Sequence, residues 1–129
     1  MDQSLDKNKY DLEERTAQFA EKVIDFVRSL TGDMVNSKII AQLVGAAGSI
    51  GANYCEATEA ESKKDFIHKI GICKKEIKET RHWLRLLARS EPQYKDEIRK
   101  PWKEAQELLL IFSKIIRSSK NKTENIQLR

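Results

Sequence analysis

The chain of 129 residues contains two prolines, five glycines and two cysteines, and 34% of its residues are charged. This length supports one domain with its own core, and two cysteines are too few for a disulfide framework or a cysteine-based zinc site. No apolar run approaches the roughly 20 residues that cross a bilayer, and the N-terminus lacks the features of a signal peptide, so we expect a cytoplasmic protein with no membrane partner.

The scarcity of proline and glycine favours long helices. Apolar residues recur with helical periodicity in four segments, which predict helices at about 11–30, 37–57, 63–89 and 93–118. The short connections between these helices predict an all-α fold, an antiparallel up-and-down four-helix bundle that residues 1–129 form as a single domain. Residues 119–129 are polar and basic, and we expect a flexible tail there.

The first predicted helix is acidic and has one apolar face. Gly32, which follows it, can adopt the left-handed conformation that ends many helices. Asn36 or Ser37 is the expected N-cap of the second helix, because their side chains accept hydrogen bonds from free backbone N–H groups.

The second predicted helix has a face without bulky side chains, which we call the flat face. It consists of Ala41, Gly45, Gly48 and Ala52, spaced so that they share one side of a helix. Glycine inside a helix costs about 0.5–1 kcal/mol relative to alanine, so these glycines, together with Gly51, indicate close helix contacts. The flat face lies either inside the bundle or against another subunit.

Positive charge is concentrated in the third predicted helix, for which Ser62 is the expected N-cap. Residues 63–89 carry nine basic and three acidic side chains, whereas residues 1–62 carry six and eleven. Five basic residues share one helix face and form what we call the basic stripe: Lys74, Lys78, Arg81, Arg85 and Arg89. Stacked like charges repel one another, which favours neutralisation by the phosphates of RNA or DNA, bound without base specificity.

Other interpretations of the basic stripe stay open. It is either a solvated face or a face paired with acidic side chains, in a neighbouring subunit or in the first helix, where the candidates are Glu13, Glu14, Glu21 and Asp25. His82 and Trp83 lie beside the stripe and are candidates for stacking on bases, although packing is the commoner role of such side chains. Basic residues near the C-terminus are candidates for further phosphate contacts: Lys114, Arg117, Lys120 and Lys122.

The fourth predicted helix is too apolar to bury only one face. Its first apolar line is Ile98, Trp102, Ala105, Leu109, Phe112 and Ile116, and its second is Leu108, Ile111 and Ile115. Pro101 marks either the start of the main segment or a kink. The surplus apolar surface on the third and fourth helices predicts a homo-oligomer.

A motif around the junction of the second and third helices resembles a known family. It reads Ser49-Ile50-x-Ala52-Asn53-x-x-Glu56-Ala57, then Ser62-Lys63-Lys64-Asp65-Phe66-Ile67, then Ile72, Glu76, Glu79 and Leu84. It resembles the small four-helix-bundle proteins encoded in intervening sequences of bacterial 23S ribosomal RNA genes, over roughly residues 10–118. Gly51 stands where that family often has proline. The resemblance implies an up-and-down bundle and a ring-like homopentamer, and it implies no established reaction.

The polar residues of this motif form a second candidate set: Asn53, Glu56, Glu76 and Glu79. For these residues a buried network that fixes helix register is favoured over catalysis. A di-iron bundle needs Glu-x-x-His on two helices and a glutamate from each of two others. Glu79 and His82 supply one such motif, but the other histidine, His68, lies on the same helix. We expect no metal, no cofactor and no catalytic residue.

The sequence therefore predicts a non-enzymatic, homo-oligomeric bundle that binds RNA or DNA through the basic stripe. The alternative is a protein-interaction or scaffold module whose basic face docks an acidic partner. The two differ in a measurable way, because binding to nucleic acid weakens steeply with salt, whereas a protein partner is retained after nuclease treatment.

Overall fold

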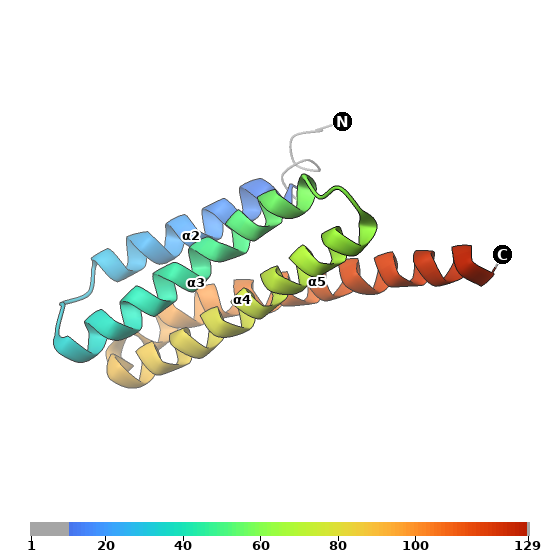
Figure 1. Cartoon of the computed structure of the whole chain (residues 1–129). Coiled ribbons are helices and arrows are strands. Elements are labelled where there is room, and N and C mark those ends of the chain that lie inside the picture. Colours follow the sequence, from blue (N-terminus) through green and yellow to red (C-terminus); the bar gives the residue numbers. More distant parts are fainter. Residues whose placement is uncertain (1–10, 129) are drawn as a thin grey trace, which may run out of the picture.

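A computed structural model describes residues 11–128, with side chains through residue 122. The chain forms an antiparallel up-and-down four-helix bundle (Figure 1) of α2 (Leu12–Arg28), α3 (Met34–Thr58), α4 (Lys63–Ser90) and α5 (Lys95–Leu128), with a 3₁₀ turn, η1 (Pro92–Tyr94), before α5. The predicted all-α bundle is confirmed. Across the described residues no helix is both long enough and apolar enough to cross a membrane.

The core follows the apolar periodicity of the sequence. In α4, the buried residues recur at steps of three and four and form a line from Ile70 to Leu87: Ile70, Cys73, Ile77, Thr80, Leu84 and Leu87. In α5, Phe112 is fully buried. The Phe112 ring meets Tyr54 of α3 edge to face, with ring centroids 5.8 Å apart, a geometry that aromatic pairs prefer. All four helices therefore contribute to one hydrophobic core.

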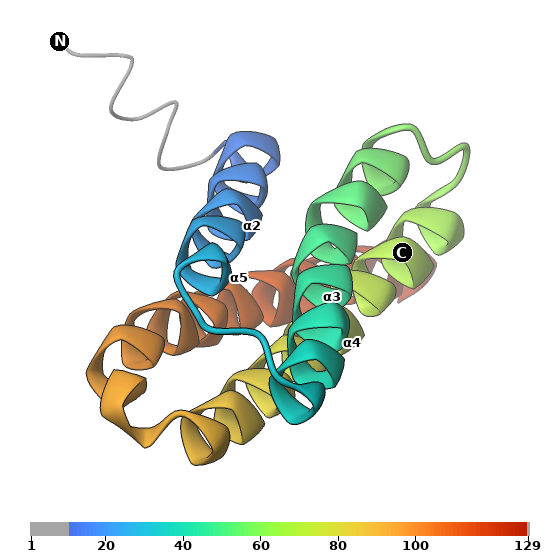
Figure 2. The same cartoon turned by 90° about the vertical axis from the view of Figure 1, so that its left-hand side faces the viewer.

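The four helices do not contact one another equally. α3 packs along α4, α4 along α5, and α2 along α3, whereas α2 touches α5 only sparsely. Figure 2 shows α2 and α4 on opposite sides of the bundle, and within the described residues no Cα atom of one lies within 8 Å of a Cα atom of the other. The diagonal placement of α2 and α4 decides which charges can pair.

The glycines of α3 have different roles. A Cβ atom at Gly51 would lie 2.9 Å from Thr16 Oγ1 of α2, while a Cβ at Gly45 or Gly48 would meet nothing within 4 Å. Gly51 therefore lets α2 approach α3 closely. The flat face instead points away from the bundle, so the interpretation that placed it inside the bundle is wrong.

Several predicted helix ends are also wrong. The N-cap of α3 is Asp33, whose Oδ1 accepts a hydrogen bond from the Asn36 backbone N at 2.7 Å, so neither Asn36 nor Ser37 caps the helix. Gly32 does not adopt a positive φ, and Ser29 is the C-cap of α2. The prediction for Ser62 is confirmed, because its Oγ accepts from the Asp65 backbone N at 3.0 Å.

The fourth helix does not end at residue 118. It continues to Leu128, because neither proline nor glycine follows Pro101 and extending an existing helix costs far less than nucleating one. Pro101 lies inside this helix. Arg129 and the side chains of residues 123–128, which belong to the predicted tail, lie outside the described part of the chain.

Asn36 is fully buried at the end of the bundle where two corners meet. Its Nδ2 donates to the carbonyl oxygen of Thr31 at 3.3 Å and to Glu91 Oε1. Ser90 Oγ donates to Asn36 Oδ1. One side chain thus links the α2–α3 corner to the α4–η1 corner.

Candidate nucleic-acid interface

Two residues of the basic stripe, Arg81 and Arg85, border α5. Arg81 Nη1 donates to Gln106 Oε1 of α5, and the Arg81 guanidinium lies 5.5 Å from the centroid of the Trp102 ring, also on α5. Lys78, Arg85 and Arg89 are exposed, whereas Lys74 and Arg81 are half-buried. Lys78 lines a hollow together with Gln42 of α3, so only part of the stripe lies at the seam between α4 and α5.

The basic stripe is not neutralised by the acidic side chains of α2 in the same chain. In the described part of the chain the ion pairs are Arg15–Glu104, Arg15–Glu107, Lys69–Glu56 and Arg99–Asp96. None of these pairs includes a residue of the stripe. The acidic α2 lies diagonally across the bundle from α4, so pairing between them within one chain, one of the alternatives from the sequence, is wrong.

A groove of about 400 Å³ lies between α4 and α5, and we call it the basic groove. Its lining residues are Leu84, Arg85, Ala88, Lys95, Ile98, Arg99, Trp102 and Lys103. Four of these are cationic and none is acidic. Three of the cations come from α5 and were missed by sequence reasoning, although Lys95, Arg99 and Lys103 recur at steps of four and so share one helix face.

Trp102 is the aromatic side chain of the basic groove. The sequence placed it on the first apolar line of the fourth helix, and 39% of it is exposed. Trp83, one of the two predicted stacking residues, is half-buried against the core and meets His82 edge to face at 5.1 Å. The structure therefore places an exposed indole among the cations, at a position different from the predicted one.

The exposed basic residues further along α5 continue the positive charge beyond the groove. Lys114, Arg117, Lys120 and Lys122 are all exposed. Lys122 lines a second hollow together with Lys63, at the N-terminal end of α4. Because α5 remains helical here, these cations are displayed on a helix and not on a flexible tail.

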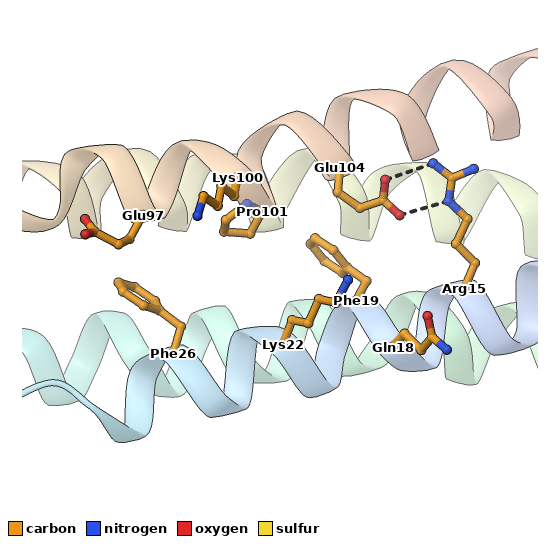
Figure 3. Close-up of a pocket in the computed structure, with 9 residues that line it drawn as sticks. All are labelled: Arg15, Gln18, Phe19, Lys22, Phe26, Glu97, Lys100, Pro101 and Glu104. Carbon is orange, nitrogen blue, oxygen red and sulfur yellow. Dashed lines mark hydrogen bonds and ion pairs between the residues drawn. The ribbon is translucent and has the colours of Figure 1, made fainter.

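Another hollow lies between α2 and α5 and measures about 550 Å³ (Figure 3). Phe19, Phe26 and Pro101 supply its apolar wall. Arg15 closes one end by donating from Nε and Nη2 to the Glu104 carboxylate, both at 2.8 Å, and these bonds raise the pKa of Arg15. This hollow carries both signs of charge, so it attracts an anion less strongly than the basic groove does.

The motif residues make separate, local contacts. Asn53 Nδ2 donates to the Ser49 carbonyl oxygen at 2.8 Å in its own helix, and Glu56 pairs with Lys69 of α4 at 3.7 Å. Burial and repulsion from Glu79 raise the pKa of Glu76. The ion pair between Glu56 and Lys69 joins α3 to α4.

The described residues contain no group of three or more His, Cys, Asp or Glu side chains arranged to hold a metal. Cys55 is exposed and Cys73 is buried, and neither forms a disulfide. Burial raises the pKa of the Cys73 thiol to about 12, so this side chain stays protonated at neutral pH and packs as an apolar group.

Comparisons with known proteins agree with this architecture. The sequence model of the family described as 23S rRNA-intervening sequence protein matches residues 8–114. Among solved structures, the chain is similar to a protein with unknown function from the S23 ribosomal protein family of Bacteroides thetaiotaomicron VPI-5482. The two are 30% identical with a TM-score of 0.70, and the match covers 81% of this chain and 96% of that one. No curated protein matches the chain.

Proposed function

The chain belongs to the 23S rRNA-intervening sequence protein family, and from that premise we propose that it is a non-enzymatic, homo-oligomeric, cytoplasmic protein that binds RNA or DNA. Membership supplies the fold and no activity, so the function is argued from the surface. The observation that carries the proposal is the basic groove, which has four cationic lining residues and no acidic one.

The groove and the basic stripe share Arg85, and we call their cations together the basic surface. Its members are Lys74, Lys78, Arg81, Arg85, Arg89, Lys95, Arg99 and Lys103. Lys74 and Arg89 are about 22 Å apart along the axis of α4, a span that several consecutive phosphates of a strand can follow. Binding gains free energy from counterions released by the nucleic acid, which does not depend on base sequence.

A salt titration tests the proposal. Nuclease-treated protein is sized by light scattering and then titrated with labelled RNA and DNA oligonucleotides at several salt concentrations. If about five phosphates are engaged, the affinity for a single strand falls by roughly 100-fold between about 50 and 200 mM salt. A folded oligomer that shows no affinity at the lowest salt would contradict the proposal and favour the protein-docking alternative.

The flat face of α3 supports the homo-oligomeric part of the proposal. Ala41, Gly45, Gly48 and Ala52 are exposed, and Met34, seven residues before Ala41 and so on the same helix face, is 79% exposed. A helix of a second copy can approach such a face closely and gain dispersion contacts. The homopentamer implied by the family resemblance is part of this proposal.

Replacing Gly45 and Gly48 together by glutamine is expected to dissociate the oligomer while the bundle stays folded. Glutamine is a good helix former, and the space around both positions is open within one chain, whereas a helix of another copy would clash with the added side chains. Light scattering measures the mass and circular dichroism the fold.

Gly51→Ala is the matched comparison within the same helix. Its Cβ would press on Thr16, and overpacking costs about 1–3 kcal/mol, offset by about 0.5–1 kcal/mol of helix propensity. This variant is expected to melt at lower temperature. An unchanged mass for the double glutamine variant would show that the flat face is not an interface between copies.

A further inference from the structure

We propose that the basic groove selects unpaired nucleotides, by stacking a base on Trp102 while the surrounding cations hold the adjacent phosphates. This inference rests on the proposed function and adds to it a ligand class, a single strand of RNA or DNA. It concerns the one large aromatic side chain that the groove exposes.

The Trp102 ring is held in place from within the protein. The Arg81 guanidinium lies over it at 5.5 Å from the ring centroid, and Arg81 is itself fixed by donating to Gln106 Oε1. A cation over an indole ring is a favourable contact. Arg81 thus packs over one side of the ring, and 39% of the residue remains open to solvent.

The charges around the ring suit one nucleotide. Arg85 lines the groove from α4, and Arg99 and Lys103 line it from α5 on either side of Trp102 in the sequence. A base on the ring thus has phosphate-binding side chains from both helices around it. Arg99 pairs with Asp96 at 3.6 Å, but both side chains are more than half exposed, so this contact is weak and easily exchanged for a phosphate.

Stacking on Trp102 requires an unpaired base. In a duplex the flat faces of the bases are covered by their neighbours, whereas a single strand can turn a base outward onto an aromatic side chain. A duplex can satisfy the cations but not the indole. The groove should therefore favour single strands, with little dependence on which base is stacked, because every base has a π face.

The chain contains a second tryptophan that serves as an internal comparison. Trp83 packs half-buried against the core, and the chain has two tryptophans, so Trp83→Phe leaves Trp102 as the single indole fluorophore. This variant is titrated at low salt with single-stranded RNA, single-stranded DNA of the same sequence, an RNA duplex and inorganic polyphosphate. Quenching by the two single strands, without quenching by duplex or polyphosphate, is expected.

Affinity measurements in the otherwise unchanged protein provide an independent test. Trp102→Leu is expected to lower the affinity for single strands by about 5- to 150-fold, while affinity for duplex and polyphosphate stays the same. Trp102→Phe is expected to restore most of the loss, because phenylalanine also stacks. Circular dichroism and thermal melting show whether each variant folds.

The outcomes separate this inference from the proposed function. Equal losses for single strand, duplex and polyphosphate in Trp102→Leu, or quenching by all of them, overturn the stacking inference and leave phosphate binding intact. Binding of none of the probes by the unchanged protein overturns both.

Discussion

Replacing Arg85, Arg99 and Lys103 with glutamate is expected to lower the affinity for a short RNA at low salt by about 100-fold or more, because each lost phosphate contact removes a released counterion and each new carboxylate repels the strand. All three residues line the basic groove. The slope of log affinity against log salt should also become shallower by about two to three, because each contact removed contributes roughly 0.7 to 1. Titration of labelled RNA over a range of salt concentrations measures both quantities.

A matched variant distinguishes the contribution of the groove to affinity from the contribution of net charge. Replacing Lys22, Lys38 and Lys100 with glutamate changes the total charge by the same amount at exposed positions outside the basic surface. We expect this control to lose only a few-fold in affinity, through the weaker long-range field. Similar losses in both triple variants would show that overall charge, and not the groove, governs binding.

The groove variant is expected to remain folded. Arg85, Arg99 and Lys103 are exposed, and the pair between Arg99 and Asp96 is a surface ion pair of the kind that contributes about 0–1 kcal/mol. Melting temperature and helical circular dichroism should therefore stay close to those of the unchanged protein. Unfolding would instead mean that these cations are needed for the bundle itself.

Asn36→Leu is expected to reduce the free energy of unfolding by about 3 kcal/mol, because three partly buried groups, one of them a carboxylate, each lose a hydrogen bond. The affected groups are the Thr31 carbonyl, the Ser90 hydroxyl and the Glu91 carboxylate. For a domain of this size the loss corresponds to a fall in Tm of roughly 10 °C. Thermal and urea unfolding at a fixed protomer concentration measure it, since association also shifts the Tm.

Asn53→Leu is the control for the loss of stability expected of Asn36→Leu. Asn53 is also an asparagine of α3, but it is half-buried and its amide donates to a carbonyl of its own helix. Its replacement should change the free energy of unfolding by only about 0.5 kcal/mol, as surface substitutions usually do. Equal stability of the Asn36 and Asn53 variants would mean that the link between the two corners contributes little.

Local geometry explains what sequence reasoning predicted correctly. The bundle fold follows from four apolar stripes with helical period, and the burial of the line from Ile70 to Leu87 follows from the same period. The basic stripe could be assigned to one face of α4 because steps of three and four residues repeat on a helix whatever it packs against. The Ser62 cap depends on contacts three residues away and is equally local.

Other predictions failed because they depended on neighbours in space. Trp102 falls on an apolar line with Ile98 and Ala105, yet those two are buried and it is partly exposed. Periodicity identifies which face of a helix is buried, but it does not show whether a residue lies at the centre or at the edge of that face. The position of α4 beside α5 decided that this edge opens into a cationic groove.

The pairing of charges also depends on both the local sequence and the tertiary structure. The acidic character of the first helix and the basic character of α4 are properties of the sequence, but the up-and-down topology places α2 and α4 diagonally, so they cannot neutralise each other in one chain. Arg15 instead reaches Glu104 and Glu107 of α5.

The amino-acid sequence by itself determined the helices, the core-facing sides and the concentration of positive charge on α4, because these depend on residues within a few turns of one another. Only the tertiary structure decided that the flat face points outward, that Asn36 joins two corners, and that cations of α5 complete the groove beside Trp102. These features depend on which faces of helices distant in the chain meet, and that is decided by packing of the whole core.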